Sequence, residues 1–152
     1  MDILAMSQAY LTAITCSGAF LLAGLLTGVW KYLCIRASDE AVAPHYVDIA
    51  HRAALMYSFA TLVIAEFTKL TGFSDGLNVF LVSVQVFFFG SAILLYVVHG
   101  ILNDTDNQLR VPHVMGRMTI PPLAMTGLLG LLIIGEVGGF GTMFVGFIMH
   151  NF

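Results

Sequence analysis

Charge is the property that this chain most lacks. Only 10% of its 152 residues are Asp, Glu, Lys or Arg, whereas 59% are hydrophobic and the mean hydropathy is +0.91. Soluble domains carry about 25% charged residues, so this chain cannot cover a water-facing surface. Its six Lys and Arg side chains are scattered and form no basic patch, which argues against a nucleic-acid partner. The composition predicts an integral membrane protein in contact with a lipid bilayer.

Cysteine is also scarce, and the start of the chain lacks a basic segment. Cys16 and Cys34 fall on one predicted helix, roughly 27 Å apart at a rise of 1.5 Å per residue, which is too far for a disulfide within the chain. The cysteines therefore do not identify a redox compartment. The first four residues contain no Lys or Arg, so we expect no cleaved signal peptide.

Several catalytic signatures are missing as well. The sequence has no Cys-x-x-Cys-His motif for covalent haem attachment, no phosphate-binding P-loop and no dinucleotide fingerprint. Its five histidines are too few and too scattered for a histidine-rich di-iron hydroxylase. No Ser or Cys has an evident base beside it, so nucleophilic catalysis by those residues is not expected.

Four long apolar segments dominate what the sequence does contain. Each has about 20 residues or more, which is enough to cross a bilayer. Because every backbone polar group must be satisfied inside hydrocarbon, these segments are predicted to be helices. We therefore predict a single all-α domain over residues 1–152, an integral membrane four-helix bundle with helices over about 10–33, 47–70, 76–102 and 121–148.

The loops determine the expected topology. The short loop between the second and third segments predicts a tight antiparallel hairpin, and only Lys69 lies beside it. The two longer loops are flanked by Lys31, Arg36, Arg110 and Arg117. Positive charge marks the cytoplasmic side, so we expect the long loops in the cytoplasm and both termini outside. Separately, we expect the membrane to be a bacterial inner membrane.

Glycines mark places where helices can approach one another closely. Gly24 and Gly28 form a GxxxG step in the first segment, and the last segment carries seven glycines. Two interpretations stay open at this point: packing within the chain, or an interface in a homo-oligomer. The run from Gly138 to Gly141 could also divide the last helix into two pieces.

Polar side chains gather at the long-loop ends of the second and third segments. The second segment begins with His51 near Asp48 and Arg52, and the third ends with Tyr96 and His99. Steps of three and four residues continue each group along one helix face, and the two faces together predict a pocket. Its expected members are His51, Tyr96 and His99 at the mouth and Leu55, Phe88, Phe89 and Ala92 on the walls.

Histidine is a common ligand of haem iron and of other metals, which makes His51 the candidate metal ligand. Asp48 could fix the tautomer of its ring. Asp48 and Arg52 are equally expected to form a plain ion pair, because they are four residues apart on one helix. The alternative role for the histidines is interfacial, with hydrogen bonds to lipid headgroups or water.

Two glutamates lie in the apolar segments. Glu66 precedes Lys69 by three residues, so a helix-end ion pair is expected. Glu136 lies deep in the last segment, where a carboxylate is costly, and this makes it a candidate functional group.

The residues around His51 resemble a family motif. The pair Ala50-His51, followed by Met56, Tyr57 and Ser58, is similar to the second-helix motif of the small four-helix membrane isomerases, the styrene oxide isomerases and hydroxylaminobenzene mutases. That family shares the size and number of spans of this chain. Residues 25–28 also resemble the first helix of the mutases.

The resemblance implies that His51 is the axial ligand of a b-type haem, that the ferric iron acts as a Lewis acid on an epoxide oxygen, and that the protein is a trimer. Tyr96 falls where the epoxide isomerases carry a tyrosine that positions the substrate. Tyr57 and Ser58 stand where the family has Asn-Gly, and that Asn contributes to substrate binding. The resemblance therefore implies a different substrate, or a lost reaction.

Three functions follow as hypotheses. The leading one is a haem b-dependent isomerase that acts as a Lewis acid on a small apolar oxygenated substrate, in a homo-oligomer. The second is a bis-His b-type cytochrome that exchanges electrons with quinone. The third is a non-catalytic accessory subunit of a larger membrane complex, which binds no cofactor. The expected site residues are Tyr96, Tyr57 and Asp48 for catalysis, His51, His99 and Arg52 for the cofactor, and His51 for the metal.

Overall fold

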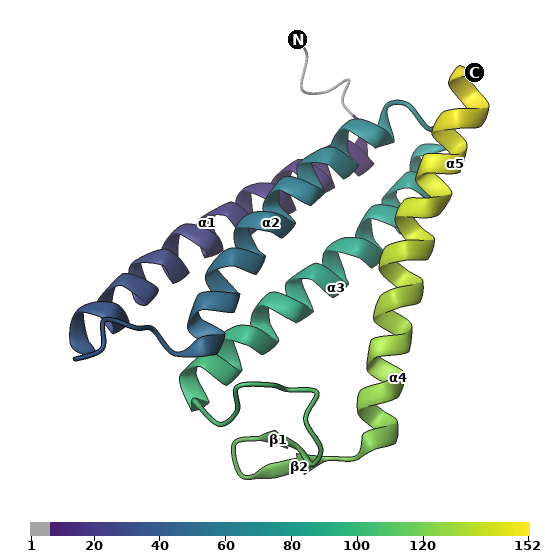
Figure 1. The fold of residues 1–152 in the computed structure, drawn as a ribbon. Helices are drawn as coiled ribbons and strands as arrows, with labels where there is room; N and C mark the ends of the chain where they lie inside the picture. Colours follow the sequence, from purple (N-terminus) through teal and green to yellow (C-terminus); the bar gives the residue numbers. More distant parts are fainter. Residues whose placement is uncertain (1–6) are drawn as a thin grey trace.

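The computed structural model describes residues 7–152, and most of them are helical (Figure 1). In chain order the elements are α1 (Gln8–Ala37), α2 (His45–Thr68), α3 (Asp75–Leu102), the short strands β1 (His113–Met115) and β2 (Met118–Ile120), α4 (Pro122–Ile133), the π-helical turn η2 (Ile134–Gly138) and α5 (Gly139–Asn151). The first four residues, for which no signal peptide was expected, lie outside the described part of the chain.

Within residues 7–152, four helices are long and apolar enough to cross a membrane: α1, α2, α3 and the continuous helix Pro122–Asn151. This confirms the predicted all-α four-helix class. The bounds differ from the predicted ones by up to four residues, because capping side chains help to set where a helix begins. The side chains of Ser7 and Ser74 accept hydrogen bonds from the amides of Tyr10 and Leu77, and so begin α1 and α3.

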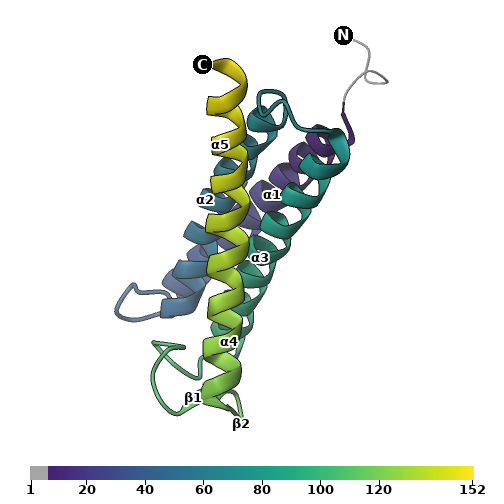
Figure 2. The same ribbon diagram turned by 90° about the vertical axis from the view of Figure 1, so that its right-hand side faces the viewer.

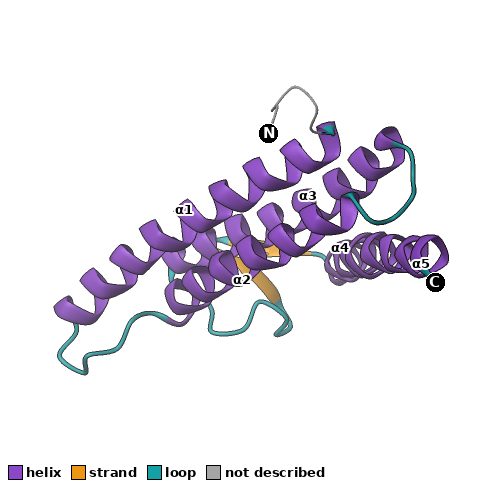
Figure 3. Cartoon of the chain, turned by 90° about the horizontal axis from the view of Figure 1, so that it is seen from above, coloured by secondary structure: helices purple, strands orange, loops and turns teal. Residues whose placement is uncertain are grey.

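Helices α1, α2 and α3 pack along one another, whereas the last helix crosses them at a steep angle. Figure 3 shows α4 and α5 nearly end-on while α1 to α3 are seen from the side. The turn η2 and helix α5 contact α3, but α4 leans away from it toward the β hairpin (Figure 1, Figure 2). The bundle is therefore closed at the α2–α3 turn and open at the end of the long loops.

The GxxxG step of α1 is buried against α2. A Cβ atom added at Gly24 would lie 2.6 Å from Leu55 Cδ2 and 3.2 Å from the Leu55 amide nitrogen, and one added at Gly28 would lie 2.8 Å from His51 Cε1. The two glycines thus allow the helices to approach closely. Of the two interpretations of this step, the structure supports packing within the chain.

The core lies at the closed end of the bundle. Its buried members are Ala13, Ile64, Ala65, Leu81, Val82, Phe89 and Met143. On the outside, large apolar side chains such as Met56 (72% exposed), Phe59 (69%) and Leu123 (85%) point away from the bundle. Such a surface suits a bilayer, because lipid tails are as apolar as these side chains.

A buried asparagine closes the turn between α2 and α3. Asn78 Nδ2 donates to the Thr68 carbonyl at 3.1 Å, and its Oδ1 accepts from the Thr71 hydroxyl at 3.0 Å. On the surface of this turn, Lys69 Nζ lies 2.8 Å from Glu66 Oε1, and the hydrogen bond to Glu66 raises the pKa of Lys69. The predicted tight hairpin and the predicted Glu66–Lys69 ion pair are both present.

The loop between α3 and α4 holds a feature that the sequence analysis missed. It contains a two-stranded antiparallel hairpin in which His113 pairs with Ile120 and Met115 with Met118. The chain reverses at Gly116, whose φ of +60° suits a residue without a Cβ atom. Strands of three residues are too short to give an alternating hydrophobic pattern, so the sequence showed only a polar loop.

The glycine-rich part of the last segment does not divide the helix. Residues 134–138 form one π-helical turn, and α5 continues directly from it. A Cβ atom added at Gly135 would overlap the Phe88 ring, and one added at Gly139 would lie 3.0 Å from Gln85 Cγ. Gly135 and Gly139 therefore allow the last helix to pack closely on α3, and they do not interrupt the helix.

Candidate functional site

His51 lies on the side of α2 that faces α1. Its Nδ1 is 2.8 Å from the carbonyl oxygen of Gly24, and its ring lies over Gly28. A carbonyl oxygen only accepts hydrogen bonds, so Nδ1 must carry the proton and donate it. In the neutral ring the lone pair is then on Nε2, which is the arrangement that metal-binding histidines use.

Three charged side chains cluster near this histidine at the end of α2. The carboxylate of Asp48 is paired with both Lys31 of α1 and Arg52 of α2, with the Arg52 nitrogen at 2.9 Å. The predicted Asp48–Arg52 pair is present, whereas the contribution of Lys31 from another helix was missed. The Gly24 carbonyl, rather than Asp48, therefore orients the His51 ring. Asp48 pairs with Lys31 and Arg52. Arg52 stays 62% exposed and can still bind an anionic group.

His99 ends α3 and anchors the loop that follows it. Its side chain is 1% exposed, its Nδ1 lies 2.8 Å from Asp104 Oδ1, and its ring is 5.0 Å from that of Tyr46. The other Asp104 oxygen accepts a hydrogen bond from the Gly116 amide in the β hairpin. His99 thus connects helix, loop and hairpin. The sequence analysis did not single out Asp104, because nothing in the local pattern ties it to His99.

The two histidines therefore have different neighbours. His51 lies against α1, whereas His99 lies against Tyr46 at the start of α2. Tyr46 and His51 are five residues apart, which places them about 140° apart around α2 at 3.6 residues per turn. We expected His51, Tyr96 and His99 to lie around one pocket mouth. Within one chain this is wrong for His51, which contacts α1 instead.

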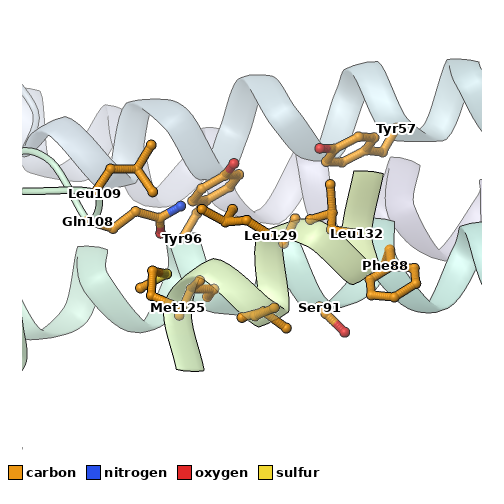
Figure 4. A pocket seen from close by; sticks show the side chains of 12 residues that line it. Tyr57, Phe88, Ser91, Tyr96, Gln108, Leu109, Met125, Leu129 and Leu132 are labelled. Carbon is orange, nitrogen blue, oxygen red and sulfur yellow. The ribbon is translucent and has the colours of Figure 1, made fainter. Parts of the chain in front are cut away.

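A pocket does exist, but it lies between α3 and α4, with one wall from α2 (Figure 4). Its volume is about 240 Å³, and four of its residues were named from the sequence: Tyr57, Phe88, Ala92 and Tyr96. The remaining lining residues are Ser91, Leu95, Gln108, Leu109, Met125, Leu128, Leu129 and Leu132. The pocket is on the α4 side because α4 leans away from α3 and leaves space there.

Two other expected wall residues lie elsewhere. Leu55 packs against Gly24 in the α1–α2 contact, and the ring of Phe89 stacks on that of Tyr57 with their centroids 4.4 Å apart. Phe89 thus supports the pocket from behind by holding the Tyr57 ring. Tyr57 and Tyr96 also border a second hollow on the outer face of α2, beside Arg52 and Met56.

Polar atoms in and near the pocket lack partners. Within residues 7–152, Gln108 Oε1 and Glu136 Oε1 are buried without a hydrogen bond, and neither the Tyr57 nor the Tyr96 hydroxyl makes one. Buried polar atoms without partners are rare and costly. The Tyr57 and Tyr96 side chains line the pocket, so their hydroxyls are the candidates for contact with a ligand. Glu136 follows the pocket residue Leu132 by one helical turn.

In the part of the chain that the structure describes, no three His, Cys, Asp or Glu side chains gather into a set that could hold a metal ion. A haem needs only one or two protein ligands, because the macrocycle supplies the others. A lone histidine with a fixed tautomer, such as His51, meets that smaller requirement.

We expect the Asp104 anchor to make stability depend on pH. Burial alone would raise the pKa of Asp104, but hydrogen bonds from the Gly116 amide and His99 outweigh it and hold this pKa below its ordinary value. The stability that the carboxylate contributes is present above the unfolded pKa of about 4 and is lost as the pH falls through the lower folded pKa.

Replacing Asp104 with Asn tests this expectation. The variant should lose about 2 kcal/mol at neutral pH, since the two hydrogen bonds to the charged carboxylate, one to each oxygen, are weakened. It should also lose the step in stability below about pH 4. Thermal unfolding by circular dichroism in detergent measures both effects, with Asp39→Asn in the first loop as the control. Parallel pH profiles for wild type and Asp104→Asn would contradict the assignment.

No family model, curated protein or solved structure matches the chain.

Proposed function

We propose that this chain is a haem b-dependent membrane isomerase that acts on a small apolar oxygenated substrate, with His51 as the iron ligand. The observation that carries the proposal is the bond between His51 Nδ1 and the Gly24 carbonyl, which puts the lone pair of the neutral ring on Nε2. The family resemblance around Ala50 and His51 supports it. The pocket also supports it, because the hydroxyls of Tyr57 and Tyr96 make no hydrogen bond within residues 7–152 and could contact a substrate there.

The residues present fit a haem held by one histidine. His51 is partly exposed, and the outer faces of α1 and α2 present apolar side chains such as Leu25 and Met56. Arg52 can pair with a haem carboxylate at the membrane surface. When bound through one imidazole, ferric haem supplies a Lewis acid with an open coordination position.

The other residues of this chain would bind and orient the substrate. The hydroxyls of Tyr57 and Tyr96 can donate hydrogen bonds to an oxygen atom in the pocket. The apolar walls from Phe88, Leu129 and Leu132 exclude water, which strengthens those hydrogen bonds. Because His51 faces α1 and the pocket faces α4, we propose that a second copy of the chain brings the two together.

One observation favours the accessory-subunit hypothesis as a second candidate. A Cβ atom added at Gly127, Gly130, Gly138 or Gly141 would meet no atom of residues 7–152 within 4 Å. These glycines leave a smooth surface on the last helix, against which another helix could pack. The bis-His cytochrome has less support, since His99 is almost fully buried and held by Asp104.

An absorption spectrum of the purified protein tests the proposal. Protein made in cells supplied with haem should show a Soret band with a broad high-spin ferric spectrum. His99→Ala should keep that spectrum, because His99 is not a ligand in this proposal. Sharp α and β bands after reduction that disappear in His99→Ala would support the cytochrome instead. Absence of any Soret band would overturn both haem hypotheses and leave the accessory subunit.

A further inference from the structure

The hollow on the outer face of α2, beside Arg52, combines one cation with an apolar surface. We call it the outer hollow; its volume is about 280 Å³, and it is open toward the outside of the bundle. Arg52 is its only charged lining residue. The others are Ile49, Ala53, Met56, Tyr57 and Tyr96. It lies at the end of the bundle where α4 leans away from α3 (Figure 1), so it faces the surrounding bilayer.

The depth of Arg52 in the membrane follows from the length of α2. The 24 residues of this helix span about 36 Å at 1.5 Å per residue, whereas the hydrocarbon core is about 30 Å thick. Arg52 lies seven residues after His45, the first residue of α2, so a long side chain there can reach the headgroup layer. Met56 is one turn deeper, among the lipid tails. A molecule in the outer hollow therefore meets a cation at its polar end and apolar walls along the rest.

The charge beside the outer hollow is positive overall. One oxygen of the Asp48 carboxylate pairs with Lys31, and the other lies 2.9 Å from Arg52 Nη2. A single carboxylate thus balances two cations and leaves one positive charge. The Arg52 side chain is 62% exposed, compared with 30% for Lys31, so Arg52 presents this charge to a ligand. A guanidinium has five N–H donors and can bind a second anion while it is paired with Asp48.

We propose that the outer hollow binds an anionic phospholipid, with its phosphate on Arg52 and an acyl chain along Ala53 and Met56. Basic sites at helix ends attract anionic headgroups in this way. A zwitterionic lipid brings a cation of its own to the positive cluster, so it gains less. A soluble anion has no part that fits the apolar walls. The inference does not rest on the proposed function, because the binding needs neither haem nor substrate.

The bound lipid would lie next to the pocket between α3 and α4. Tyr57 and Tyr96 border both that pocket and the outer hollow, so the two spaces adjoin at these rings. An acyl chain in the outer hollow would cover the α2 side of the rings. The lipid would then complete a wall of the pocket in the part of the bundle that the last helix leaves open.

Native mass spectrometry of the full chain, released from detergent micelles, tests the inference by competition. The two probes are dioleoyl phosphatidylglycerol and dioleoyl phosphatidylcholine at equal concentration, which have the same chains and differ in headgroup charge. Wild type should retain the anionic lipid about fivefold more than the zwitterionic one. Arg52→Gln should retain both equally. Arg36→Gln, which removes an exposed cation near the end of α1 and outside the outer hollow, should keep the preference.

Two further variants separate the charge from the shape of the site. Asp48→Asn removes the carboxylate that balances the cations, so the preference should rise about fivefold further. Ala53→Trp places a ring in the outer hollow while Arg52 stays in place, and it should abolish the preference. A preference that stays unchanged in either variant would overturn the inference.

Three other outcomes would also overturn it: equal retention of the two lipids by wild type, an unchanged preference in Arg52→Gln, or an equal loss in Arg36→Gln. The same spectra show bound haem by its mass. Absence of haem together with selective lipid retention would count against the proposed function alone, and haem binding without lipid selection would count against this inference alone.

Discussion

Replacing His51 with glycine is expected to remove the Soret absorbance, and added imidazole is expected to restore it. The structure supports this because the His51 ring occupies the space over Gly28 and is held through Nδ1 by the Gly24 carbonyl. Removing the side chain leaves a ring-sized space at the same place, in which free imidazole can bind and serve as ligand. Loss of bound haem should be about tenfold or more, since even residues that only support a ligand contribute that much.

The measurement is the ratio of Soret absorbance to protein concentration after purification, with and without imidazole. His45→Gly is the matched control, because His45 lies exposed at the start of the same helix. It should leave the haem content unchanged. If His51→Gly retains full haem, His51 is not the ligand and both haem hypotheses fail. If imidazole restores the Soret band, the loss was due to the missing ligand rather than to misfolding.

Replacing Gly24 with isoleucine is expected to destabilise the bundle by about 3 kcal/mol, the upper part of the range for overpacking. Its Cβ would lie 2.6 Å from Leu55 Cδ2 and 3.2 Å from the Leu55 amide nitrogen. The leucine side chain can move, but the backbone of α2 cannot do so without separating the helices. The change should also weaken the bond from His51 to the Gly24 carbonyl and so lower haem retention.

Thermal unfolding in detergent, followed by circular dichroism, measures this effect. Gly18→Ile is the matched control on the same helix, because Gly18 is exposed and a Cβ atom there would meet nothing within 4 Å. Isoleucine at that position faces lipid and should change the melting temperature little. Equal melting temperatures for the two variants would show that the close approach of α1 and α2 at Gly24 does not stabilise the protein.

The face of α2 that contains His51 shows what a sequence pattern can predict about helix packing and what it cannot. His51 and Leu55 do lie on one side of the helix, as their spacing predicted, but that side faces α1 rather than α3. Leu55 packs on Gly24, and the Ser58 carbonyl accepts a hydrogen bond from Ser17 at 2.9 Å. A helical stripe identifies residues that are buried together, but an apolar stripe fits more than one neighbouring helix.

The pocket also shows which residues a sequence pattern can group and which it cannot. Phe88, Ala92 and Tyr96, which the sequence analysis placed in one pocket, do line the same pocket together with Tyr57, whereas Gln108 and the lining residues of α4 were missed. Tyr57 and Leu132 are too far apart in sequence for any periodic pattern to join them. These two residues line the same pocket because of the angle at which the last helix crosses α3.

The sequence by itself determined the class of this protein, its four helices and the tight turn between α2 and α3. Hydrocarbon imposes a minimum length and a closed hydrogen-bond pattern on any segment that crosses it, so composition and run length suffice. Only the tertiary structure decided that His51 lies against Gly24, that His99 is held by Asp104, and that the pocket opens toward α4. Those outcomes depend on the packing of whole helices and loops, since the groups that meet are set by the rotation and crossing of each helix rather than by local spacing.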